Sequence, residues 1–264
     1  MDESPTAGTI LAKRTEALPD PGFEVSAVVE GDELVMVQTE VGLAGVAMNP
    51  EGPIPDVTGN STYEVARQGA TATDTGTRAV GVAALNAIDP PNQRQPGLDP
   101  FRSLDPETEQ VAMVGLFGPV LKHLDAGHVD VFERNPQTVT VPESLAAELD
   151  TAMHPPAAAS ELVPEAEVLF ITGSSLVWGG IETYLQAARP DQTVVVVGAS
   201  ASFGPQPLFE AGVSMVAGAS VTDPEHVRRA ITGGKSEADL HDGGLTKWAV
   251  VDPTVSSLPG LCLD

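Results

Sequence analysis

Residues 167–182 read EVLFITGSSLVWGGIE, and this stretch sets the architecture expected for the rest of the chain. Val168 to Ile171 form a short, continuously apolar run, which is typical of a strand buried on both faces of a parallel sheet. In an open α/β sheet, the loop after such a strand borders the ligand crevice, and the next helix start presents free backbone N–H groups. The sequence therefore predicts a binding site at the turn that follows, Thr172, Gly173, Ser174 and Ser175.

From residue 109 onward, strand patterns alternate with helix patterns. Besides 168–171, strands are predicted at 111–116, 128–132, 193–197, 214–216 and 245–251, and helices at 119–125, 143–153, 177–188, 206–211 and 224–231. Strands that alternate with helices in this way form a parallel sheet with right-handed crossovers. The second part of the chain is therefore predicted to be a Rossmann-like, doubly wound and mainly parallel sheet.

The first part of the chain follows a different pattern. It predicts a helix at 6–18, strands at 23–30, 34–39 and 41–48 that form an antiparallel meander, and helices at 61–68 and 75–88. Small side chains along 75–88 predict that this helix lies against the meander. Five prolines between Asp89 and Pro106 mark a linker or a long surface connection. We therefore expect an α+β domain with a linker at 1–108 and a Rossmann-like domain at 109–264.

The chain is strongly acidic. It has 13 Lys and Arg against 37 Asp and Glu, a formal net charge of −24, and only four of the basic residues are Lys. Such a charge repels phosphate backbones and anionic membranes, so neither nucleic acid nor a membrane is an expected partner. A hydrophobic fraction of 42% with this acid excess is typical of a folded protein of halophilic type, in which concentrated salt screens self-repulsion.

Nothing in the sequence indicates secretion or membrane insertion. The N-terminus carries acids where a signal peptide carries basic residues, and no apolar run approaches the ~20 residues that span a bilayer. The single cysteine, Cys262, cannot form an internal disulfide, which fits a reducing compartment. We therefore expect a soluble, cytoplasmic protein, and the sequence leaves open whether it forms a homo-oligomer.

A glycine-bearing turn and a later acid indicate a ligand with hydroxyl groups. The strand at 111–116 runs into VGLFGPV, where Gly115 and Gly118, on either side of Phe117, let a ligand approach the backbone. This turn lacks the G-x-G-x-x-G fingerprint of dinucleotide sites. Glu133 ends the next strand 18 positions after Gly115, where an acid bonds ribose hydroxyls in Rossmann-type sheets. The alternative for Glu133 is a solvated acid that pairs with Arg134.

Two polar turns at strand ends favour binding over ordinary helix capping. The turn at 172–175 offers hydroxyl and N–H donors that suit an anion, and the turn at 198–202, with Ser200 and Ser202, leaves the next strand in the same way. Capping is the usual role of Ser and Thr at one such turn, but two side by side favour a binding role. Neither turn has the G-x-S-x-G spacing of a hydrolase, so the sequence leaves open whether the protein is an enzyme.

Metal-ligand spacings are absent from the sequence. The five His residues show no H-E-x-x-H spacing and there is no Cys pair, which argues against a structural zinc site or a thiolate cage. His241 and Asp242 form a candidate ligand pair, with a hydrophilic loop as the alternative, and Glu133 is a further candidate. A P-loop is also missing, which disfavours an ATPase.

Segments spread over nearly the whole chain form one combined pattern. They are VGLAGVAM, VGVAALNA, VGLFGPVLKHL, VDVFERNP, AEVLFITGSSLVWGGIETYL, VVVVGASASFGPQPLFEAGVSMVAG and VTDPEHVRRAITGG. At this spacing they resemble the putative heavy-metal chelation family. The resemblance implies a domain similar to the N-terminal domain of enolase, then a Rossmann-like domain, and a ligand pocket between the two.

The resemblance also points to individual pocket residues. They are Asn86, Glu133, Thr172 to Ser174, and Ser200. It assigns a ligand role to Asn86, whose residue type alone favours a place at a helix end. The chain departs from the family at Trp178, where Asn is usual, at Gly180, where Thr is usual, and at Ala199, where a Pro precedes the Ser. These changes predict a more apolar pocket, lined by Trp178, whose ligand differs from that of the relatives.

Two functional hypotheses follow. In the first, the pocket holds a metal chelate or a small anionic metabolite, and Glu133, Asn86 and the Ser-rich turns supply oxygen donors that favour divalent cations over soft metals. In the second, the protein is an enzyme, such as a transferase, that uses an adenosyl or nucleotide cofactor with Glu133 on the ribose. Metal binding would support the first, and stabilisation by S-adenosylmethionine, NAD or ATP would support the second.

Overall fold

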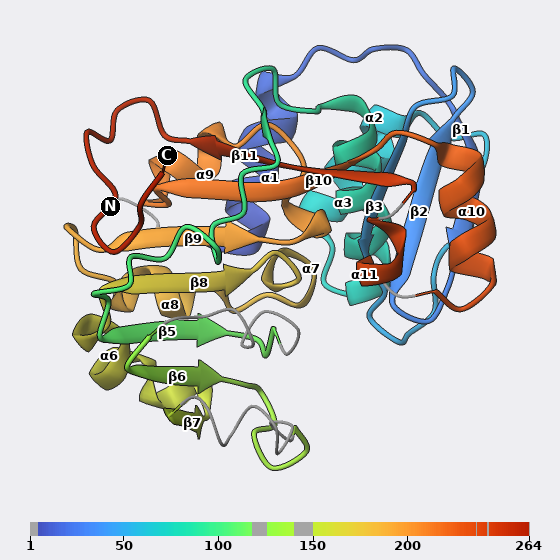
Figure 1. The fold of residues 1–264 in the computed structure, drawn as a ribbon. Coiled ribbons are helices and arrows are strands. Elements are labelled where there is room, and N and C mark those ends of the chain that lie inside the picture. Colours follow the sequence, from blue (N-terminus) through green and yellow to red (C-terminus); the bar gives the residue numbers. More distant parts are fainter. Residues whose placement is uncertain (1–4, 118–125, 140–149, 236, 242, 264) are drawn as a thin grey trace.

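The computed structural model describes residues 5–117, 126–139, 150–235, 237–241 and 243–263. The chain forms a three-stranded antiparallel sheet and an eight-stranded, mostly parallel sheet, here called the small and the large sheet (Figure 1). The predicted mixed α/β class is confirmed. Within the described residues, no helix combines the length and the apolar character needed to cross a membrane.

The small sheet is a meander of β1 (Val25–Glu30), β2 (Leu34–Thr39) and β3 (Ala44–Met48). The predicted third strand begins at Ala44 because residues 40–43 form the turn between β2 and β3. One face of the sheet carries α3 (Thr75–Ile88), α3 contacts α2 (Thr62–Thr71), and α2 contacts α1 (Ala7–Ala17). Asp74 caps α3, since its carboxylate accepts the Thr77 amide at 2.8 Å. The predicted packing of this helix on the meander is confirmed.

The large sheet has the strand order β4-β11-β10-β9-β8-β5-β6-β7. Its strands are β4 (Gln95–Pro96), β5 (Gln110–Val114), β6 (His128–Phe132), β7 (Asp150–His154), β8 (Val168–Thr172), β9 (Thr193–Val197), β10 (Met215–Val221) and β11 (Leu245–Val251). The run from β7 to β10 is parallel, whereas β11 and β4 are antiparallel to their neighbours. Taken in chain order, the parallel strands follow the 3-2-1-4-5-6 order of Rossmann folds, with the reversal between β5 and β8.

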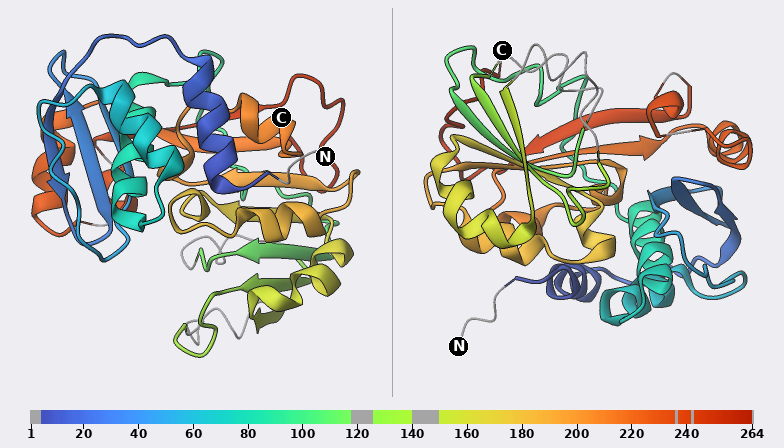
Figure 2. Two further views of the ribbon diagram at one scale, coloured as in Figure 1. Left: turned by 180° about the vertical axis from the view of Figure 1, so that it is seen from behind. Right: turned by 90° about the horizontal axis from the view of Figure 1, so that it is seen from below.

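The remaining helices cover faces of the two sheets (Figure 2). The further helices are α6 (Ala159–Leu162), α7 (Ser175–Trp178), α8 (Ile181–Ala187), α9 (Gln206–Glu210), α10 (Pro224–Thr232) and α11 (Glu237–Leu240), with 3-10 turns η1 (Pro156–Ala158), η2 (Val163–Glu165) and η3 (Ala199–Ala201). Side chains of α1, α6, α8 and α9 pack on one face of the large sheet. Val227 and Ile231 of α10 pack on the second face of the small sheet, against Val29 and Met36. The hairpin β10–β11 therefore leads from the large sheet onto the small one.

The proline-rich connection differs from the surface linker predicted for it. Phe101 and Leu104 are buried on the face of the large sheet opposite α8, together with Val111 and Phe170. Gln95 and Pro96 form the edge strand β4 beside β11. The prediction of a surface connection is wrong for Phe101 and Leu104, because these two large apolar side chains cover a sheet face, whereas Gln95 and Pro96 are exposed.

Two further predictions are corrected. Residues 150–153 belong to β7, not to a helix at 143–153, because they pair with β6 in parallel register. The helix predicted at 177–188 is split into α7 and α8, since Gly179 and Gly180 adopt φ angles of 82° and 90° that a helix excludes. The helix predicted at 119–125 and residues 143–149 of the other lie outside the described residues.

Candidate functional site

A cavity of about 900 Å³ lies at the carboxyl ends of the parallel strands. Its lining includes Val114, Phe132, Thr172 and Val197, the last residues of β5, β6, β8 and β9. The strand order reverses between β5 and β8, and open α/β sheets bind ligands at such a reversal. The cavity therefore lies where this fold favours a ligand.

Three separate parts of the chain enclose the cavity. The small sheet contributes Met48, at the end of β3, and Glu33, between β1 and β2. The proline-rich connection contributes Phe101, whose ring lies 5.2 Å from that of Phe117. The strand ends of the large sheet supply the remainder. A molecule in this cavity would contact both sheets at once.

The turn after β5 is shaped by Gly115 and by the Glu133 carboxylate. Gly115 has a φ of 83°, and an added Cβ would lie 3.1 Å from the Thr172 side chain, so only Gly fits without strain. Oε1 of Glu133 accepts the Leu116 amide at 2.7 Å, and both residues line the cavity. Within the described part of the chain, Oε2 of Glu133 has no hydrogen-bond partner. The turn therefore holds a half-buried carboxylate in place with one oxygen left for a ligand.

Arg134 and Tyr184, which the sequence did not predict as cavity residues, lie beside Glu133. The Arg134 guanidinium lies over the Trp178 ring, 4.0 Å from its centroid, and no ion pair joins Arg134 to Glu133 among the described residues. Burial and, second, the charge of Glu133 raise the pKa of Tyr184 to about 12, so its phenol is neutral at physiological pH. Both side chains line the cavity. Their only sequence signal is the placement of Arg134 directly after Glu133.

The side-chain hydrogen bonds of the turn at 172–175 are made within the turn. The hydroxyls of Thr172 and Ser174 are 3.0 Å apart, and the Ser175 hydroxyl donates to the Thr172 carbonyl at 2.7 Å. Thr172, Ser174 and Ser175 line the cavity, whereas Gly173 does not, because its amide pairs with the Val197 carbonyl at 2.6 Å. Short α7 has no side-chain N-cap bond, so these hydroxyls stabilise the turn and do not cap the helix.

Ser200, Ser202 and Asn86 connect the two sheets. Ser200 lines the cavity, and its hydroxyl oxygen accepts the Met48 amide of β3 at 2.9 Å. Ser202 and Asn86 are not among the lining residues: Ser202 accepts the Ala219 amide at 2.9 Å, and Asn86 Nδ2 donates to the carbonyls of Val46 at 2.8 Å and Ala199 at 3.1 Å. Asn86 therefore links the last turn of α3 to β3 and to the 198–202 turn, and it is not the residue that ends the helix.

Several lining residues of the cavity outside the predicted set are aromatic or basic, among them Phe101, Lys247 and Trp248. Trp248 lies over Gly218, where an added Cβ would be 2.7 Å from the ring, and its Nε1 donates to Ser220 at 2.9 Å. Lys247 is exposed beside it. These residues come from β10, β11 and the proline-rich connection, so no local motif could have brought them together.

The described residues do not fit a metal ion held by the protein. Among them, no three His, Cys, Asp or Glu side chains are placed to share a metal. His241 lines the cavity, and Cys262 is exposed elsewhere. Asp242 and Gly118, two of the predicted site residues, lie outside the described residues. Within the described residues, the candidate Glu133 thus belongs to no group of three such side chains.

Comparison with known proteins shows which family the chain resembles. A family model described as "Putative heavy-metal chelation" matches residues 99–249, and a second model with the same description matches residues 15–88. A structure of a protein of unknown function from Pyrococcus horikoshii is 20% identical, with a TM-score of 0.70, and the match covers 93% of this chain and 100% of that one. A structure of a protein from Desulfitobacterium hafniense, also of unknown function, is 19% identical, with a TM-score of 0.71, and the match covers 93% of this chain and 98% of that one. Among curated proteins, none matches this chain.

Proposed function

The chain belongs to the family described as "Putative heavy-metal chelation", and we propose that it binds a small organic ligand in the cavity, between a domain at 1–108 and a domain at 109–264. Support comes from the position of the cavity at the reversal of strand order and from its lining by both sheets. The ligand contacts Glu133, the 172–175 turn and Ser200, and Trp178 gives this site an apolar wall.

One observation carries the proposal: the Glu133 carboxylate is held by the Leu116 amide at 2.7 Å, inside the cavity. A carboxylate accepts hydrogen bonds only, so its second oxygen suits a ligand hydroxyl or N–H group. Because a backbone bond already fixes the side chain, little conformational entropy is lost when the ligand binds. Glu133 therefore selects ligands that donate hydrogen bonds, such as compounds with neighbouring hydroxyls.

Glu133→Gln is expected to abolish most of the stabilisation that the ligand provides. Gln keeps an oxygen that accepts the Leu116 amide but loses the charge, so the turn is retained while the ligand contact weakens. A ligand at 100 times its dissociation constant raises the free energy of unfolding by about 2.7 kcal/mol. Thermal-shift assays in high salt would test adenosine, AMP, ATP, NAD, S-adenosylmethionine and simple polyols.

Glu225→Gln provides the matched control, because Glu225 is an exposed acid of α10 outside the cavity lining. The control should keep the full ligand-induced shift. Equal shifts in Glu133→Gln and the wild-type protein would remove Glu133 from the site. Ligands that shift neither protein would argue against the cavity as a binding site for these classes.

A metal enters this function only as part of the ligand. Since the described residues place no three metal-binding side chains together, Zn²⁺, Ni²⁺ or Co²⁺ alone is expected to produce no saturable heat in calorimetry and no retained metal after dialysis. A metal complexed by an organic chelator is expected to bind as the organic ligand does. Saturable binding of a free ion would contradict this proposal and point to ligands outside the described residues.

A second candidate is an enzyme that uses an adenosyl or nucleotide cofactor. The observation that favours it is Glu133 itself, at the end of the second strand of a 3-2-1-4-5-6 sheet, where ribose hydroxyls are bound in Rossmann folds. In this candidate, the neutral Tyr184 phenol near Glu133 could donate a hydrogen bond to the cofactor. Shifts by S-adenosylmethionine or a nucleotide that are lost in Glu133→Gln would favour it, and shifts by polyols alone would favour simple ligand binding.

A further inference from the structure

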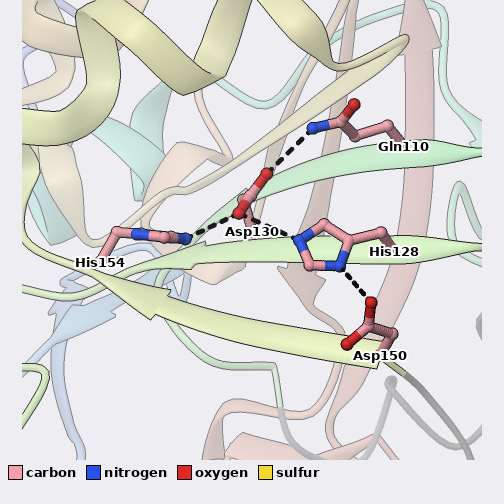
Figure 3. Close-up of polar contacts among 5 residues, drawn as sticks. All are labelled: Gln110, His128, Asp130, Asp150 and His154. Carbon is pink, nitrogen blue, oxygen red and sulfur yellow. Dashed lines mark hydrogen bonds and ion pairs between the residues drawn. The ribbon is translucent and has the colours of Figure 1, made fainter.

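A polar network lies at the edge of the large sheet, outside the cavity lining (Figure 3). At its centre is Asp130 of β6, whose side chain is only 4% exposed. Its carboxylate contacts His154 Nε2 at 2.7 Å, His128 Nε2 at 3.2 Å and Gln110 Nε2 at 3.1 Å. The two imidazoles approach Asp130 from opposite sides, a bridging arrangement and not a shared metal site.

His128 is placed between two carboxylates. Its Nδ1 lies 2.9 Å from Oδ2 of Asp150, and its Nε2 lies 3.2 Å from Oδ1 of Asp130. An ionised carboxylate only accepts hydrogen bonds, so both ring nitrogens must carry a proton to satisfy this geometry. Burial lowers the pKa of His128, but the hydrogen bonds to Asp150 and Asp130, with their charges, outweigh it and raise the pKa above its ordinary value.

The other described groups around His128 do not reverse this effect. From β5, Gln110 is uncharged, and from β7 the neighbours are Asp150 and His154. Glu109 contacts His128 only through its carbonyl, and Glu167 bonds the amides of residues 109 and 110. On the side of α8, Tyr184 packs on Phe132 and is neutral up to a pH near its pKa of about 12.

The network also connects the sheet edge to the cavity. Among the described strands β7 pairs with β6 alone, and β7 ends at His154. The Glu133 amide donates to the His154 carbonyl at 3.0 Å, and the His154 ring lies 5.7 Å from that of Phe132. Glu133 and Phe132 both line the cavity. The position of β7 therefore affects the backbone from which the Glu133 carboxylate projects.

We propose that Asp150, His128, Asp130 and His154 form a pH-sensitive clamp that holds β7 against β6 and positions Glu133. His128 has a higher pKa folded than unfolded, so the clamp is complete below about pH 6.5 and is lost as the pH rises through the folded value. His128 and His154 are positioning residues, since neither lines the cavity. The effect on a ligand rests on the proposed function, whereas the clamp itself does not.

The test measures the clamp without a ligand. Proton–nitrogen NMR should show both ring nitrogens of His128 protonated at pH 6, and Asp150→Asn should lower its pKa. Hydrogen exchange, corrected for the intrinsic rate, should show that protection of the Glu133 amide falls about threefold between pH 6 and pH 9. The fall should persist in His226→Gln, a histidine of α10 outside the network, and vanish in His128→Gln.

Three results would overturn the clamp. One is a His128 pKa at or below 6.5, and a second is protection of Glu133 that does not depend on pH. The third is a pH dependence that survives in His128→Gln. If His128→Gln does not fold, the pKa of His128 measured in Asp150→Asn tests the clamp instead. Asp150 is 78% exposed, so its substitution removes no core contact. Failure of ligand binding would leave these results unaffected and would concern the proposed function alone.

Discussion

Asp89→Ala is expected to lower the free energy of unfolding by about 3 kcal/mol, measured by denaturant titration. Asp89 follows α3 and is 8% exposed. Its carboxylate accepts Arg14 Nε at 2.5 Å and Nη2 at 2.6 Å, and also the Gly204 amide at 2.9 Å. Without it, Arg14 is left as a partly buried cation and the Gly204 amide loses its partner. Breaking a buried pair costs about 3–5 kcal/mol, and the 22% exposure of Arg14 favours the lower end.

The control for Asp89 is an exposed pair on the same helix. Lys13 of α1 pairs with Glu210 of α9, but their side chains are 61% and 50% exposed, so Glu210→Ala should cost less than about 1 kcal/mol. Concentrated salt screens exposed pairs far more than buried ones, so the cost of Asp89→Ala should persist in high salt. Equal and small costs in both variants would contradict the role given to Asp89.

Gly45→Ala is also expected to destabilise the protein by about 3 kcal/mol. An added Cβ on this β3 residue would lie 2.3 Å from the Ala83 carbonyl oxygen, 2.4 Å from the Ala87 amide nitrogen and 2.7 Å from the Asn86 carbonyl carbon. These are backbone atoms of α3, so the clash can be relieved only by moving the helix. Intrinsic preference alone would predict a gain of about 0.5–1 kcal/mol, because Gly in a strand interior is less favourable than Ala.

The sign of the Gly45→Ala effect therefore distinguishes packing from propensity. Gly52→Ala serves as the control, since a Cβ there has no other heavy atom within 4 Å and φ is not in the left-handed region. This variant should change the free energy of unfolding by less than about 0.5 kcal/mol. The helix shift in Gly45→Ala should also expose the Val46 carbonyl that Asn86 binds, detectable as faster exchange of neighbouring β2 and β3 amides. A stable Gly45→Ala protein would show that α3 packs less closely than the structure indicates.

Elements with a strong local pattern were predictable. The strands 34–39, 128–132, 193–197 and 245–251 match the observed bounds, because apolar, β-branched runs adopt the same conformation in almost any sheet. β7 was missed because its residues are only partly buried, so no apolar run marks it. The burial of Phe101 and Leu104 was missed because prolines suggested a linker, and nothing local shows that a sheet face needs a cover.

The candidate site was predictable where its residues lie at the ends of strongly patterned strands. Gly115, Glu133, Thr172 and Ser200 lie at or just after strand ends. The carboxyl ends of parallel strands share one edge of the sheet, so the meeting of these residues around one cavity could be expected. Tyr184, Trp248 and Phe101 could not be found this way, because they reach the cavity from a helix, an antiparallel strand and a distant connection. The His128 network could not be predicted either, because its residues come from β5, β6 and β7 and meet only through the pairing of these strands.

By itself, the sequence determined the type of each strongly patterned element, the Rossmann-like class and the strand-end turns that border the cavity. The tertiary structure alone decided what each polar side chain does. Asn86 and Ser202 bond backbone groups of neighbouring elements, Asp89 neutralises Arg14, and His128 lies between two carboxylates. The physical reason is the sequence separation of the interacting residues. The periodic pattern of apolar residues that predicts a helix or strand involves residues a few positions apart, whereas the hydrogen-bond partners of these polar side chains belong to segments far apart in the chain.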